Sequence, residues 1–292
     1  MKKEWKILTA LLGFIFLLKL IIAQIPHCKP PSGEIFYPWL SSYNYKNSIV
    51  CRISSPDGYK RPEVKKGSFS EWLRYLPLKP EGSPVLLYNG KRFYSQEGHF
   101  AVVDIDIGGE NLQQCADAVI RLRAEYLFSR GRFSEISFNF TNGTSASFLK
   151  WARGYRPLIH NNRVRWIKRE GRDFSYRNLR RYLRVVFAYA GSYSLARQMK
   201  ALKPGEKPGI GDVIVEGGFP GHAVIIVDEA VNSETGERLY LIAQSFMPAQ
   251  SIYILKATNE TLSPWYKIRA LDQKLITPFW IFDDLQKQMR RF

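Results

Sequence analysis

The sequence predicts an α+β fold in which helices pack on an antiparallel sheet. Apolar residues recur at helical spacing in several segments between positions 111 and 199, and four strand-like apolar runs follow between positions 212 and 255. Helices followed by a meander of strands are typical of α+β proteins. Hydrophobic residues make up 45% of the 292 positions and aromatic residues 14%, so the chain can bury a substantial core and is not a disordered protein.

Residues 1–23 have the pattern of a signal peptide. Three lysines stand near the start of the chain, an apolar run extends from Ile7 to Leu18, and Ala23-Gln24 resembles a cleavage site. The run is short and is followed by Lys19, which favours a cleaved signal peptide, with an uncleaved membrane anchor as the alternative. We therefore expect an exported protein that resides in the periplasm or is associated with the membrane on its periplasmic side.

Residues 24–76 are predicted to form a loop-rich lead-in, because they are rich in Pro, Ser, Tyr and Gly. The pattern Ser68-Phe-Ser-Glu71 predicts a capping box at the start of a short helix. Cys28 and Cys51 flank part of this segment and could pair, because export implies an oxidising compartment. Such a pair would leave Cys115 as the odd thiol of the chain's three cysteines.

Residues 77–292 are predicted to form one α+β domain. The helix expected over 111–128 carries its apolar residues, Cys115 among them, on one face. A strongly basic helix is expected over 174–189, and a short helix over 192–199. The principal strands are expected at 100–107, 136–140, 164–167, 212–215, 223–228, 239–244 and 251–255.

A basic insertion is expected within this domain at residues 150–208. From Lys150 to Lys203 there are fifteen Lys or Arg residues against two acids, a net of +13 out of +17 for the whole chain. Such a charge attracts anionic partners, which for an exported protein are peptidoglycan, another anionic envelope component or the membrane surface. No nucleic-acid-binding motif accompanies the charge, so nucleic acid is not an expected partner. One side of the basic helix forms a candidate anion-binding site, with a solvated face as the alternative: Arg177, Arg180, Arg181 and Arg184.

His222 is the candidate general base. It stands at the start of the apolar run from Ala223 to Val227, and the lack of polar residues in that run predicts a strand buried on both faces. A turn rich in Gly and Pro precedes it at 217–221. A histidine in that position is held rigidly and can still exchange its proton, as a general base requires. The alternative is a structural histidine that bonds to the backbone.

Cys115 and Gln244 are the candidate nucleophile and orienting group. Cys115 lies near the start of a helix, where the helix dipole lowers the pKa of a thiol. Gln244 ends the strand that follows the His222 strand, so a hairpin would bring its amide close to the imidazole. Asp228 is an alternative for the orienting role, and Cys115 is a buried core residue in the alternative interpretation.

No cofactor or metal is expected. Asp104 and Asp106 alternate on a predicted strand, but no cation-binding loop surrounds them, and no Cys/His spacing is typical of a zinc site. His99 precedes the same strand and is either a further site residue or a loop histidine.

The candidate residues lie in segments that resemble a known enzyme family. Gly211-Asp-Val213 and Gly221-His-Ala-Val224, followed by a strand ending at Gln244, resemble the NlpC and CHAP branch of papain-like cysteine hydrolases. This resemblance implies a papain-like fold and cleavage of peptide or amide bonds in bacterial peptidoglycan. It also implies catalytic roles for Cys115, His222 and Gln244.

The chain from about Pro77 onward also resembles an uncharacterised domain-of-unknown-function family of exported bacterial proteins. That resemblance implies no activity. The segments that carry it are 112–126, 138–143, 220–224 and 243–250.

The sequence thus predicts an exported thiol hydrolase that cleaves amide or peptide bonds of the cell envelope, with the stem peptide of peptidoglycan as the expected substrate. Cys115 would attack the carbonyl carbon, His222 would carry the proton and Gln244 would orient the imidazole. The alternative is a non-catalytic envelope-binding protein that uses the basic segment and keeps Cys115 as a core residue.

Overall fold

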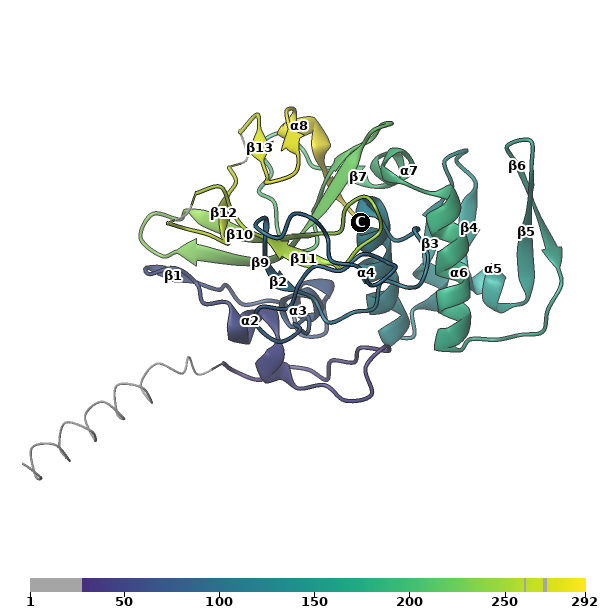
Figure 1. Ribbon diagram of the computed structural model, residues 1–292, viewed down its shortest axis with the longest axis horizontal. Helices are drawn as coiled ribbons and strands as arrows, with labels where there is room; N and C mark the ends of the chain where they lie inside the picture. The colour runs from purple at the N-terminus through teal and green to yellow at the C-terminus, as the bar shows by residue number, and fades with distance from the viewer. Residues whose placement is uncertain (1–27, 260, 270–271) are drawn as a thin grey trace, which may run out of the picture.

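Antiparallel strands dominate the computed structural model, which describes residues 28–259, 261–269 and 272–292 (Figure 1). The predicted signal peptide, residues 1–23, lies outside the described residues. In the described part of the chain the main sheet has nine strands. Seven follow the order β2 (His99–Val102), β11 (Tyr253–Leu255), β10 (Arg238–Gln244), β9 (His222–Asn232), β8 (Val213–Glu216), β15 (Met289–Arg291) and β7 (Lys200–Ala201). The other two, β1 (Tyr59–Lys60) and β12 (Tyr266–Lys267), pair with β9 and β10 near the hairpin that joins those strands.

The predicted papain-like α+β fold is wrong. The sequence predicted helices packed on an antiparallel sheet, in a papain-like arrangement with an inserted basic helical segment. In the structure β1, β12 and β15 add strands of two or three residues to the main sheet, and few helices accompany it. Strands this short carry too little alternation of apolar and polar residues to be detected, so the predicted proportion of sheet was too low.

Strand β9 lies at the centre of the fold. Its residues alternate between two apolar clusters, with Ala223 facing one cluster and Val224 facing the other. Helix α4 (Cys115–Ser129) belongs to the first cluster, and β14 (Ile281–Phe282) contributes to the second. The predicted burial of this strand on both faces is confirmed.

Capping decides where two of the helices begin. Ser68 accepts a hydrogen bond from the Glu71 N–H at 3.2 Å, which confirms half of the predicted capping box at the start of α3 (Phe69–Arg74), whereas the Glu71 carboxylate accepts from the Gly67 N–H at 2.6 Å and not from Ser68. Helix α4 begins later than predicted, at Cys115, because the N–H of Gln114 donates to the Asp117 side chain at 3.1 Å. The remaining helices are η1 (Tyr45–Asn47), α2 (Ile49–Arg52), η2 (Phe133–Glu135), α5 (Phe148–Ala152), α6 (Tyr176–Tyr189), α7 (Ser192–Gln198) and α8 (Leu285–Gln288). None of the helices in the described ranges has the length and apolar character needed to cross a bilayer.

The described part of the lead-in packs onto the rest of the protein. Tyr37 and Trp72 are buried in the first cluster with their ring centroids 5.0 Å apart. Cys28 and Cys51 form a disulfide, the pairing that the sequence left open. Three two-stranded sheets lie outside the main sheet within the described residues: β3 (Ser137–Asn139) with β4 (Ser145–Ser147), β5 (Tyr155–His160) with β6 (Arg163–Lys168), and β13 (Leu275–Ile276) with β14.

Candidate functional site

Helix α4 places Cys115, its first residue, against the start of β9. The thiol faces the carbonyl oxygen of Gly221, with 4.0 Å between Sγ and that oxygen. Cys115 is 6% exposed. Burial, followed by the nearby carboxyl group of Asp117, raises the pKa of the thiol to about 11, although backbone N–H groups beside the sulfur oppose the shift. The thiol is therefore protonated at neutral pH in this arrangement.

The imidazole of His222, the first residue of β9, is fully buried among three aromatic rings. These rings belong to Phe246, Trp280 and Phe282, with centroids 5.1, 5.2 and 5.8 Å from that of the imidazole. Nε2 lies 2.8 Å from Gln244 Oε1, whereas Nδ1 has no hydrogen-bond partner among the described residues. Burial lowers the pKa of His222 to about 4, so the ring is neutral at pH 7.

Gln244 fixes the tautomer of the buried imidazole. Its Nε2 donates to the hydroxyl of Tyr253 at 2.6 Å, so its Oε1 is turned toward His222 and accepts the proton carried by the imidazole Nε2. The lone pair of the neutral ring is then on Nδ1. That nitrogen is the one able to accept a proton from a thiol.

Sequence reasoning missed three residues that support this arrangement: Gln113, Ser245 and Tyr253. The Ser245 hydroxyl lies 3.2 Å from the carbonyl oxygen of Gln113 and 2.9 Å from that of Gln250, which ties the end of β10 to the loop before Cys115. The available signal for Ser245 was the polar pair Gln244-Ser245 at the end of a buried strand. No sequence signal pointed to Tyr253, because tyrosine is common in strands.

The structure brings Cys115, His222 and Gln244 into one region, in a closed arrangement. Cys115 contacts the residue directly before His222, and His222 bonds to Gln244. No hydrogen bond joins the Cys115 sulfur to Nδ1 within the described residues. The loops on either side expose apolar side chains, with Phe219 82% exposed and Met247 40% exposed.

The model of one protein family, a domain of unknown function named DUF4846, matches residues 49–291, which include all of these side chains. The chain belongs to the DUF4846 family. No curated protein matches the chain, and no solved structure matches it. Membership of an uncharacterised domain family is thus confirmed, whereas the resemblance to NlpC and CHAP hydrolases is not supported. A buried strand after a Gly-rich turn is too common in antiparallel sheets to identify one family.

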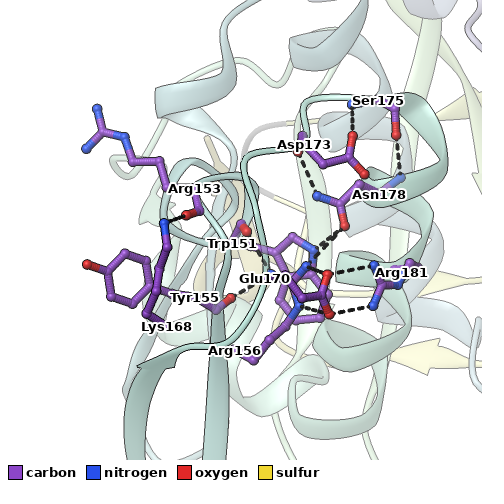
Figure 2. Close-up of polar contacts among 10 residues, drawn as sticks. All are labelled: Trp151, Arg153, Tyr155, Arg156, Lys168, Glu170, Asp173, Ser175, Asn178 and Arg181. Atoms are coloured by element: carbon purple, nitrogen blue, oxygen red, sulfur yellow. Dashed lines mark hydrogen bonds and ion pairs between the residues drawn. The ribbon is translucent and has the colours of Figure 1, made fainter.

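The four arginines predicted to bind anions in this DUF4846 protein are largely engaged by its own carboxylates. Three form ion pairs: Arg180 with Asp106 at 2.7 Å, Arg181 with Glu170 at 2.8 Å, and Arg184 with Glu110. Figure 2 shows the second pair, in which Glu170 lies between Arg181 and Arg156. Arg177 is exposed and is in no ion pair with the described residues.

The other candidate residues of the DUF4846 chain lie outside this region. The Asp228 carboxylate bonds to Arg61 and Arg74 at 2.6 and 2.7 Å, so it does not orient His222. The ring nitrogens of His99 lie 2.6 and 3.2 Å from two backbone carbonyl oxygens. In the described residues no group of three or more His, Cys, Asp or Glu side chains is arranged to hold a metal ion.

Acidification should destabilise the DUF4846 protein through His222. The ordinary pKa of histidine is 6.5, and burial lowers that of His222 to about 4 in the folded protein. The unfolded state therefore binds the proton first, and stability that is present above pH 6.5 is lost as the pH falls toward 4. Between pH 8 and pH 5 this effect lowers the unfolding free energy by about 2 kcal/mol. We expect this part of the loss to be absent from the His222→Gln protein. Urea denaturation of both proteins measures this loss, and parallel pH profiles would contradict it.

Proposed function

We propose that this protein is an exported thiol hydrolase that cleaves amide bonds of the cell envelope. The observation that carries the proposal is the bond between His222 Nε2 and Gln244 Oε1, which leaves Nδ1 available as a base. The free thiol of Cys115 faces the carbonyl oxygen of Gly221, which is the residue directly before His222. A histidine that only fills space would be expected to pair both ring nitrogens, because an unpaired buried nitrogen costs about 1–3 kcal/mol.

In the proposed reaction, Nδ1 of His222 takes the thiol proton as the Cys115 sulfur attacks the amide carbonyl carbon. The electron pair of the carbonyl moves to the oxygen, and backbone N–H groups of Cys115 and Ala116, which are near the sulfur, stabilise the negative charge. The imidazolium then protonates the leaving amine as the C–N bond breaks, which leaves a thioester on Cys115. Water deprotonated by the same nitrogen hydrolyses the thioester and regenerates the thiol.

Access to this site requires the covering loops to move. The turn that carries Phe219 and the segment that carries Met247 expose apolar side chains that a substrate can contact. Burial is the main cause of both the raised pKa of Cys115 and the lowered pKa of His222. Opening would reduce that burial and bring the two pKa values closer together, so the proton would pass more readily from sulfur to nitrogen. Substrate binding is therefore the event that activates the pair.

Export and an envelope substrate belong to the same proposal. The disulfide between Cys28 and Cys51 supports an oxidising compartment. The net charge of +17 favours surroundings rich in anionic polymer or lipid. The stem peptide of peptidoglycan supplies amide bonds in that location.

Thiol labelling distinguishes a nucleophile from a packing residue at position 115. Cys28 and Cys51 are paired, so iodoacetamide reacts with Cys115 alone. If His222 accepts the thiol proton when the loops open, His222→Gln should slow labelling at pH 7 by about a hundredfold. If Cys115 only packs, the substitution loosens its surroundings and labelling becomes faster. His99→Gln is the matched control and should leave the rate unchanged.

Faster or unchanged labelling in the His222→Gln protein would refute the hydrolase proposal. It would favour the non-catalytic envelope-binding alternative, in which Cys115 is a core residue.

A further inference from the structure

The β5–β6 hairpin extends from the body of the protein beside α5 and α6 (Figure 1). The two strands pair along their whole length, and Asn161 and Asn162 join them with φ values of 46° and 60°. Two successive residues in the left-handed region are typical of a type I′ turn, whose twist matches that of the strands. The hairpin is therefore a regular, well-defined projection.

The two faces of this hairpin have different surroundings. Ile159, Val164 and Trp166 share one face and pack against the first apolar cluster. The opposite face is called here the outer face. Its turn end carries two exposed cross-strand pairs, Leu158 with Arg165 and His160 with Arg163, and its base carries the partly buried pair Arg156 with Ile167.

At the base of the hairpin, basic side chains form ion pairs with Glu170. Residues 150–172 include eight Lys or Arg residues and one acid, Glu170. Glu170 lies 2.5 Å from Arg156 and 2.8 Å from Arg181, and Figure 2 shows it between these two side chains. Lys168 also bonds within the base, to the carbonyl oxygen of Arg153. Among the described residues, no carboxylate forms an ion pair with Arg163 or Arg165 on the outer face, so their charges are free for a partner.

We propose that the outer face of the β5–β6 hairpin binds the surface of an anionic lipid bilayer. Arg163 and Arg165 bond to lipid phosphate groups, and Leu158 enters the apolar layer beneath them. Each Lys or Arg held near an anionic membrane raises the affinity by about fivefold. This proposal does not depend on the chemistry proposed for Cys115.

Leu158 favours a bilayer over a soluble polyanion as the partner. It is 43% exposed and lies on the same face as the two arginines. A hydrated polymer offers anionic groups to the guanidinium groups but no apolar phase in which a leucine can be buried. A bilayer surface offers both, and proteins that bind bilayer surfaces combine basic and apolar side chains in this way.

Vesicle co-sedimentation of residues 24–292 tests the proposal, because this chain lacks the predicted signal peptide and keeps every described element. We expect binding to vesicles of phosphatidylglycerol with phosphatidylcholine, and none to phosphatidylcholine alone. The double substitution Arg163→Gln, Arg165→Gln should lower the partition coefficient by about 30-fold. Leu158→Asn should lower it several-fold and should leave binding to soluble polyphosphate unchanged.

The matched control is Lys91→Gln with Arg92→Gln, which removes the same charge from another exposed turn. Equal losses in the hairpin and control variants would overturn the proposal, because binding would then follow net charge alone. Binding to polyphosphate without binding to the anionic vesicles would assign the outer face to a soluble polyanion instead. Vesicle binding that is insensitive to Leu158→Asn would also contradict insertion into the apolar layer.

Discussion

Cys115→Ala should abolish amide hydrolysis. Without sulfur the thioester cannot form, so we expect the rate to fall by at least about a thousandfold. Release of new amino groups from purified peptidoglycan fragments measures the rate. Mass spectrometry of the unsubstituted protein during turnover should show the acyl group attached to Cys115.

The alanine variant should remain folded. Cys115 lies beside Ala116 on a buried helix face, and the loss of one sulfur atom there costs on the order of 1 kcal/mol of unfolding free energy. A melting curve close to that of the unsubstituted protein is therefore the control. Hydrolysis that persists in a folded Cys115→Ala protein would end the thiol mechanism.

Asp228→Ala should cause the largest loss of stability among the substitutions considered. Asp228 is fully buried in β9, and its two oxygens bond to Nε of Arg61 at 2.6 Å and Nε of Arg74 at 2.7 Å. Arg74 is itself buried. Removal of the carboxylate leaves the buried guanidinium group of Arg74 and the partly buried one of Arg61 without this counter-ion, so we expect the unfolding free energy to fall by about 3–5 kcal/mol.

Asp284→Ala is the matched control for that experiment. Asp284 also pairs with a cation, Lys287, at 2.7 Å, but both side chains are exposed. Asp284 also caps α8 by accepting a hydrogen bond from the Lys287 N–H at 3.3 Å, so its loss should lower the unfolding free energy by about 1–2 kcal/mol, to which the exposed ion pair contributes little. Urea denaturation of both variants makes the comparison, and equal effects would show that burial of the Asp228 pairs contributes nothing.

Long apolar patterns made part of the fold predictable. The strands β8 to β11 and the helices α4 and α6 lie close to their predicted positions, because each has a long apolar run or a helical apolar face. Strand β5 was missed, since Pro157 and polar neighbours interrupt its pattern. The two-residue strands β1 and β12 join the main sheet through tertiary pairing, which no local pattern encodes. These omissions explain the wrong fold class.

The candidate site was predictable in its residue types but not in its environment. The order of Cys115, His222 and Gln244 along the chain drew attention to them, yet burial of the thiol depends on packing of α4 against β9. The arginines of α6 looked free because the carboxylates that pair with Arg180 and Arg184 lie in a loop far away in sequence. Spacing along a helix shows which side chains share a face, not which acids another segment brings to it.

Strand β15 lies between β8 and β7, although both of these precede it by a long stretch of chain. The edges of β7 and β8 therefore stay unpaired during synthesis until residues 289–291 have been made. Pairing between such distant segments is slow compared with local structure formation. The main sheet of such a polypeptide is therefore completed late, after the other strands of the sheet have been synthesised.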